Sequence, residues 1–323
     1  MSASEQSAAQ TFDFAAHDLH TTQRSLWSDA FQRLIRNRLA LGSAILLTCI
    51  ITASIAAEYI PAVANHPPAQ PHFADRDSMP STEYWLGTDK LGRDLWARLM
   101  QGTLFSLKIG FGTQLIILTI GITVGMGAAL AGRLSDTILM WLTDLAYAFP
   151  DLLAIILLRQ ILFGRDWPII GSGSPQIPGA NGVLLVTIFA IAFVSWTTVA
   201  RLVRGQMLSL KETDYITAAR SIGASPWRIV RVHMLPNTLG AVIVAATFGI
   251  PLAIFAEATL GFIGLGVPPP DASLGSLIGN GRDQIQTHKI ELIWPTIMVA
   301  ILMLCFTFLG DGLRDALDPR TRK

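Results

Sequence analysis

The sequence predicts an all-α membrane protein with six transmembrane helices. Of its 323 residues, 51% are hydrophobic and only 15% are charged, whereas a soluble globular domain carries about 25% charged residues. Lipid-facing surface explains this deficit, because a charge in hydrocarbon is costly. Six apolar runs are long enough to cross a hydrocarbon core of about 30 Å at about 1.5 Å per residue. They cover residues 39–60, 109–131, 137–158, 183–203, 239–262 and 290–309.

Charge and cysteine content argue against several classes of function. The net charge of +1 offers no overall positive field, so we expect no nucleic-acid partner. Cys49 and Cys305 lie inside apolar runs and provide neither a disulfide framework nor a zinc-ligand spacing. The sequence contains no G-x-x-x-x-G-K-[ST] loop, so ATP is expected to bind to another chain. We therefore expect no catalytic residues, metal or cofactor on this chain.

The first span is flanked by polar segments on both sides. Residues 1–38 form a tail, and residues 39–60 supply the first transmembrane helix. Residues 61–104 then form a loop whose first half holds five prolines and has no apolar period, which is typical of extended backbone. Thr88 or Asp89 is expected to cap a short helix towards the end of this loop.

Glycine and proline mark the second and third spans. Gly121 and Gly125 are four residues apart and share one helix face, which permits close approach of another helix, although glycine is common in membrane helices anyway. Pro150 should kink the third span, because proline lacks a backbone N–H. Asp144 is deep in that span and should face protein or water rather than lipid. The glycine-rich segment 164–182 is interpreted as a plain connection.

The distribution of basic residues predicts the orientation. If the N-terminus is cytoplasmic, the segments on that side hold 15 of the 24 lysines and arginines, as expected for cytoplasmic loops. An even number of spans also places both termini on one side of the membrane. We therefore expect both termini in the cytoplasm, residues 61–104 outside and residues 204–237 inside.

The cytoplasmic segment between the fourth and fifth spans carries clear helix signals. Thr213 or Asp214 suits a helix N-cap, and residues 215–221 are expected to form a short helix. Gly223 should end that helix, because glycine readily adopts positive φ.

A second helix is expected directly after this glycine. Ser225 and Pro226 form the pattern of an N-cap followed by proline at the first helical position. This helix should run towards Leu235 and be interrupted at Pro236. The result is a rigid, protruding helix pair, which suits docking into a groove of a partner that moves.

The same segment resembles the EAA loop of ABC-importer permeases, in which two alanines precede a glycine and a later Leu-Pro. The matching residues are Ala218, Ala219, Gly223, Leu235 and Pro236. Thr217 replaces the usual glutamate, and His233 replaces a frequent isoleucine. The resemblance assigns a set of residues to the ATPase-coupling loop: Asp214, Tyr215, Ala218, Ala219, Arg220, Gly223, Ala224, Arg228, Leu235 and Pro236.

Three further stretches resemble the C-type subunit of the dipeptide, oligopeptide and nickel permease family. They are residues 86–107, 257–270 and 310–319. The resemblance implies a type I ABC-importer transmembrane domain in the cell inner membrane, surrounded by lipid and forming half of a translocation path. It also implies a second, related permease subunit, two cytosolic ATPase subunits that bind the ATP, and an extracytoplasmic solute-binding protein.

The apolar runs, together with this resemblance, divide the chain into five expected segments. They are a cytoplasmic tail (1–38), a first transmembrane helix (39–60), a periplasmic loop (61–104), a permease core with five transmembrane helices and the coupling loop at 204–237 (105–310), and a cytoplasmic tail (311–323). The solute is not identified by the sequence: dipeptides, longer peptides, glutathione-like molecules, nickel chelates and some sugars are all handled by similar chains.

An ion-coupled secondary transporter is the main alternative function. Such a protein needs ionisable residues along its path, and Glu257 and Asp144 are the deep candidates. Both are also candidates for an importer's translocation path. A carboxylate at membrane depth costs about 2.5–3.5 kcal/mol on insertion scales, so Glu257 should face the helix bundle or a cavity, as either a hydrogen-bonded brace or a solute contact. The sequence contains no motif that supports a membrane enzyme, and the short loop between two spans argues against a DNA-reading helix pair at 213–235.

Overall fold

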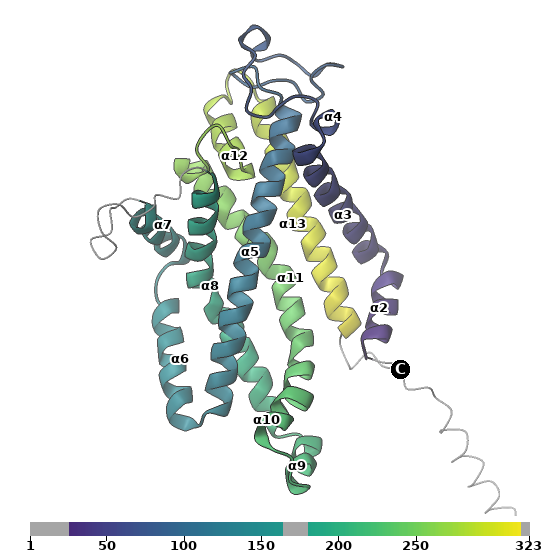
Figure 1. The fold of residues 1–323 in the computed structure, drawn as a ribbon, viewed down its shortest axis with the longest axis vertical. Coiled ribbons are helices and arrows are strands. Elements are labelled where there is room, and N and C mark those ends of the chain that lie inside the picture. Colours follow the sequence, from purple (N-terminus) through teal and green to yellow (C-terminus); the bar gives the residue numbers. More distant parts are fainter. Residues whose placement is uncertain (1–25, 164–179, 318–323) are drawn as a thin grey trace, which may run out of the picture.

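The chain forms an elongated bundle of steeply inclined helices, capped by a loop at one end and by a short helix pair at the other (Figure 1). This computed structural model describes residues 26–163 and 180–317. Within these ranges the regular structure is helical, apart from one isolated bridge between Thr88 and Asp94. The predicted all-α class is therefore confirmed.

Five helical stretches among the described residues are long and apolar enough to cross a membrane. They are α3 (Arg38–Tyr59), α5 (Leu95–Leu130), α8 (Ala180–Lys211), the continuous stretch Pro226–Leu265 and α13 (Ile290–Leu317). The stretch Pro226–Leu265 comprises α10 (Pro226–Arg228), η3 (Ile229–Met234), α11 (Leu235–Leu260) and η4 (Gly261–Leu265).

A bent pair of helices is the candidate for the remaining span. α6 (Arg133–Tyr147) and α7 (Asp151–Phe163) meet at an angle of 84°. Pro150 lies at this break, where it lacks an N–H for the helix ladder and disfavours helical backbone in the residue before it. If the pair is counted as one span, the candidate spans among the described residues number six, as predicted. The proline makes a sharp bend rather than the expected kink.

The helix that contains the predicted second span begins before that span. α5 starts at Leu95, where the side chain of Asp94 accepts a hydrogen bond of 2.8 Å from the Trp96 N–H. The expected cap at Thr88 or Asp89 is therefore wrong, and the expected short helix is the first part of α5. Residue 104, the predicted end of the loop, lies inside this helix.

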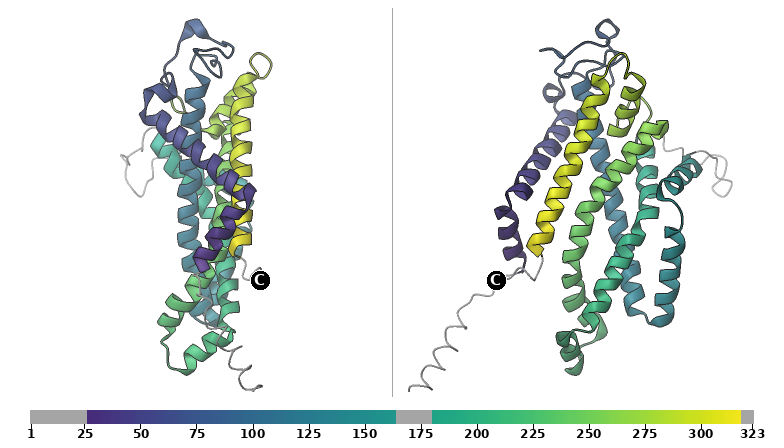
Figure 2. Two further views of the ribbon diagram at one scale, coloured as in Figure 1. Left: turned by 90° about the vertical axis from the view of Figure 1, so that its right-hand side faces the viewer. Right: turned by 180° about the vertical axis from the view of Figure 1, so that it is seen from behind.

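The last helix continues past the predicted start of the C-terminal tail at residue 311. α13 runs to Leu317 because its final turns are packed against other helices. Gly312 fits beside Ala40 of α3 and Leu34 of α2 (Leu26–Arg36), and Gly310 fits beside Phe248. Figure 2 shows α2 and α3 slanting across α13. Residues 1–25 of the N-terminal tail and 318–323 lie outside the described residues.

Short helices cover the end of the bundle opposite α9 (Asp214–Ser221). They are α4 (Pro61–Ala64), η2 (Phe73–Asp75) and α12 (Leu274–Asp283). α12 begins with a capping box, in which the Ser273 and Ser276 side chains each accept a backbone N–H of the other residue. Of the connection predicted at 164–182, residues 164–179 lie outside the described residues and 180–182 open α8.

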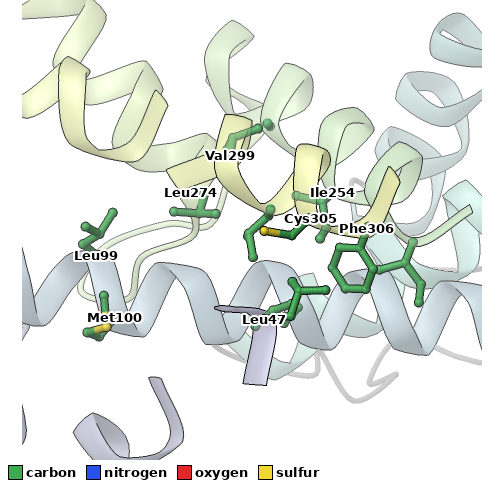
Figure 3. Packing of buried hydrophobic residues seen from close by; sticks show 12 residues of the cluster. Leu47, Leu99, Met100, Ile254, Leu274, Val299, Cys305 and Phe306 are labelled. Atoms are coloured by element: carbon green, nitrogen blue, oxygen red, sulfur yellow. The ribbon is translucent and has the colours of Figure 1, made fainter. Parts of the chain in front are cut away.

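The apolar core draws on most of the long helices. Figure 3 shows one cluster in which Leu47 of α3, Leu99 and Met100 of α5, Ile254 of α11 and Phe306 of α13 converge. Two further buried clusters join α5 to α8 and α11, one of them reaching the short helix pair. These contacts hold the segments before and after that pair in place.

The glycine face of α5 packs against α8, as the spacing predicts. A Cβ added at Gly121 would lie 2.7 Å from Val199 Cβ, and one at Gly125 would lie 2.5 Å from the Ala200 carbonyl oxygen. Neither separation is tolerated by real Cβ atoms, so the missing side chains allow the close approach.

Candidate functional site

A short helix pair protrudes at the end of the molecule away from the 61–94 loop (Figure 1). Thr213 occupies the N-cap position of α9 (Asp214–Ser221), but its hydroxyl donates to Leu210 O instead of accepting a backbone N–H of the helix. At its end, Gly223 has φ +84°, its N–H donates to Arg220 O (2.9 Å), and the Ala224 N–H donates to Ala219 O (3.0 Å). These two bonds form a Schellman motif, which explains the need for glycine.

The second helix of the pair is continuous with the fifth span. Ser225 caps α10 by accepting the Arg228 N–H, and Pro226 occupies the first turn, as predicted. The expected interruption at Pro236 is wrong. Six residues of π-helix precede α11, and the Leu235 N–H donates to Val230 O five residues back. This wider turn accommodates the missing donor of Pro236.

The inner face of the pair is anchored to α8. Ile216 and Ala219 of α9 and Ile229 of η3 are buried in one cluster with Val203 and Met207 of α8. Ala219 therefore packs inside the helix pair, where a long side chain would disturb it, whereas Ala218 is exposed. The pair is a stiff extension of α8 and α11 rather than a flexible loop.

The assigned coupling residues divide into an outer and an inner group. Those with exposed side chains or backbone are Asp214, Tyr215, Ala218, Arg220, Gly223, Arg228 and Pro236. Ala219 is buried, and Ala224 and Leu235 are half-buried.

Two apolar residues at the tip were missed by the sequence reasoning. Ile222 is 86% exposed and Trp227 is 69% exposed, on either side of the Gly223 turn. Tyr215, in the first turn of α9, is also exposed. The sequence does contain a signal for them. Turns around a glycine usually carry polar residues, whereas here large apolar residues lie on both sides of Gly223. An exposed apolar tip on a rigid projection is typical of a protein-docking surface.

Glu257 lies in the interior of the bundle, as expected of a carboxylate at membrane depth. Its side chain is 3% exposed, and its Oε2 accepts a hydrogen bond of 2.7 Å from Ser106 Oγ of α5. Ser106 Oγ in turn accepts the Leu274 N–H at the start of α12 (3.2 Å). Gly275 leaves room for the carboxylate, because a Cβ there would lie 2.8 Å from Glu257 Oε1. Glu257 thus links α5, α11 and α12.

Asp144 is in a different environment, on α6. Its carboxylate is mostly exposed in the single chain and lies 3.7 Å from Arg201 of α8. A second ion pair, Asp136 with Arg204, joins the same helices at 2.6 Å. The structure therefore does not bring Asp144 and Glu257 together, and a role for either in the translocation path remains a prediction.

The stretch 86–107 comprises the end of the loop and the first turns of α5. It contributes three charged residues to a buried polar cluster at the end of the molecule opposite α9. Asp89 accepts hydrogen bonds from the Arg93 backbone N–H (2.9 Å) and side-chain Nε (2.7 Å), and Arg98 Nε lies 3.6 Å from the same carboxylate. The Arg98 guanidinium also donates to Pro68 O and Pro270 O. These bonds attach the 61–94 loop to α5 and to the segment after α11.

Two protein-family descriptions match successive parts of the chain. Residues 121–323 match the family described as "Binding-protein-dependent transport system inner membrane component". Residues 25–80 match the "N-terminal TM domain of oligopeptide transport permease C".

Individual relatives extend this match to nearly the whole chain. The oligopeptide transport permease OppC of Bacillus subtilis is 35% identical over 99% of this chain and 97% of its own length. The dipeptide transport permease DppC of the same organism is 37% identical over 93% and 87%, respectively. A chain of the inward-facing MetNI methionine ABC transporter shares the fold, with a TM-score of 0.53 and 21% identity over 68% of this chain and 96% of its own. The chain therefore belongs to the binding-protein-dependent transport family, as the membrane-spanning permease subunit of an ABC importer.

Proposed function

We propose that this permease carries peptides or closely related small solutes, and that α9 and the following turn couple it to a partner ATPase. The solute class is supported by the names of the two Bacillus subtilis relatives, which specify oligopeptides and dipeptides. The coupling role is supported above all by the rigid projection with its exposed apolar tip. Force on this tip would reach α8 and α11 because Ile216 and Ala219 of α9 share one buried cluster with both helices.

The proposed function requires three kinds of partner protein. A related second permease completes the translocation path, and two cytosolic ATPase subunits bind ATP and engage the tip formed by Tyr215, Ile222 and Trp227. An extracytoplasmic solute-binding protein delivers the solute at the opposite end. In this arrangement both termini and the α9 end face the cytoplasm, in agreement with the bias of basic residues.

Two substitutions at the tip test the coupling role. Ile222→Asp places a charge on a highly exposed apolar side chain, and Ala218→Arg adds bulk to the exposed face of α9. Neither residue supports the spans, so both variants should reach the membrane at normal levels. Loss of an interface hot spot costs at least about 2 kcal/mol, which weakens association about 30-fold. We expect ATPase co-purification and uptake of a labelled dipeptide to fall together.

The matched control is Leu134→Asp, at the start of α6. Leu134 is 74% exposed, so the control introduces the same charge on an apolar side chain away from the α9 tip. It should retain both ATPase binding and uptake. Wild-type ATPase binding and uptake in both tip variants would refute the coupling role. Normal ATPase coupling in the wild type without transport of any peptide would instead refute the solute class alone.

A further inference from the structure

We propose that Asp77, His288 and Glu291 form a binding site for one divalent transition-metal ion. The three residues come from separate segments: the loop before α5, the connection between α12 and α13, and the first turn of α13. One ligand atom from each lies within 4.8 Å of the others. The site is at the end of the molecule opposite α9, outside the coupling surface, and it does not depend on the proposed solute.

His288 is the observation that points to a ligand. The residue is only 5% exposed, and neither ring nitrogen makes a hydrogen bond with any residue that the structure describes. Nδ1 faces Asp77 Oδ1 at 3.4 Å without hydrogen-bond geometry. A buried polar group left without a partner costs about 1–3 kcal/mol. A metal ion between the imidazole and the carboxylates would remove this cost for one nitrogen.

The two carboxylates are oriented by the local backbone. Glu291 is 4% exposed, and its Oε1 accepts the Lys90 N–H at 2.8 Å, which fixes the side chain beside His288. Asp77 has a left-handed backbone with φ +52°, a conformation in which aspartate is several-fold enriched among non-glycine residues. Its side chain is half exposed, so an ion can reach the site from solution.

Charge balance also favours a cation at this position. The nearby arginines, Arg93 and Arg98, are directed at Asp89, which makes an ion pair with each. Lys90 and Arg98 contribute positive charge near Glu291, but neither Glu291 nor Asp77 makes an ion pair with a lysine or arginine among the described residues, so both carboxylates are available to a bound ion. One imidazole and two carboxylates form a ligand set that suits Zn²⁺ and related first-row ions, with water completing the coordination. Such an ion would tie the 61–94 loop to the start of α13.

Zinc titration of the full-length chain tests the site. The chain is purified in detergent with a tag that contains no histidine, stripped with a chelator, and titrated with ZnCl₂ while melting temperature and bound zinc are followed. The wild type should bind zinc and melt at a higher temperature with it. Asp77→Asn and His288→Gln should each weaken this binding by more than about tenfold, since even outer-shell changes cost 10- to 100-fold.

The exposed position of Asp77 and one control variant make the result decisive. Asp77→Asn alters an exposed side chain, so it separates loss of a ligand from loss of the fold if His288→Gln proves unstable. His233→Gln, in the α9 end of the molecule, is the matched control and should leave the zinc-induced shift unchanged. Absence of zinc binding by the wild type overturns the proposal, as does wild-type affinity in Asp77→Asn.

Discussion

At the scale of single residues, Glu257 carries a cost that its surroundings offset. A carboxylate in the middle of an apolar helix is unfavourable in lipid, but here it is closed off by α5 and α12. Ser106 donates to it and at the same time accepts the Leu274 N–H. The structure thus favours the brace over an open contact with solute, because the carboxylate joins three elements and is buried in the single chain.

This geometry predicts different outcomes for two substitutions of Glu257. Glu257→Gln keeps an oxygen that accepts from Ser106, so membrane levels and dipeptide uptake should stay within about twofold of wild type. Glu257→Leu leaves the Ser106 hydroxyl without this acceptor, at a cost of about 1–3 kcal/mol, and should lower the melting temperature in detergent. If Glu257→Gln assembles normally but abolishes uptake, the charge itself acts in transport and the brace is not its main role.

At the scale of elements, the closeness of α5 and α8 determines how the α9 end is supported. Gly121 and Gly125 let α8 approach the α5 backbone, and the same stretch of α8 continues into the cluster beneath α9. Packing along this pair therefore extends from the middle of the bundle to the proposed docking surface. A wider gap between α5 and α8 would weaken the packing in the middle of the bundle and the support of the proposed docking surface.

Gly125→Ala should widen this gap. The added Cβ would lie 2.5 Å from the Ala200 carbonyl oxygen, and overpacking of this kind costs about 1–3 kcal/mol. We expect a lower melting temperature in detergent. The control is Gly127→Ala on the same helix, where the nearest neighbour of the added Cβ is Leu139 Cδ1 at an ordinary 3.4 Å. Equal melting temperatures for the two variants would contradict the assigned helix contact.

At the scale of the whole molecule, the helices separate two ends with different chemistry. One end carries the buried polar cluster around Asp89, and the other carries the apolar tip at Ile222 and Trp227. The described ends of the chain, α2 and the last turn of α13, lie towards the end that carries α9 (Figures 1 and 2). The proposed orientation places that end in the cytoplasm.

Labelling of single cysteines tests this orientation. Ala69 and Ser209 are both exposed and lie towards opposite ends, so each is a suitable position once Cys49 and Cys305 are replaced. In intact spheroplasts, an impermeant thiol reagent should label Ala69→Cys but not Ser209→Cys. Permeabilisation should make Ser209→Cys reactive, which controls for local accessibility. The opposite pattern in intact cells would invert the topology and remove the proposed docking side.

The sequence by itself determined the features that depend on local chemistry. Apolar length sets the spans, because each must cover the hydrocarbon. The turn at Gly223 and the cap at Ser225 followed from backbone preferences that need no distant partner. The spacing of Gly121 and Gly125 likewise indicated a close helix contact before its partner was known.

Tertiary packing alone decided the features that depend on distant neighbours. α13 continues to Leu317 because α2 and α3 pack against Gly312 and Phe248 of α11 packs against Gly310. No local signal in the sequence of α13 indicates these contacts. The π-helix before Pro236 lets the helix continue where proline normally stops it. The meeting of Asp77 with His288 and Glu291 joins segments about two hundred residues apart. Such contacts arise only when the whole bundle has formed, because each partner is supplied by a different helix or loop.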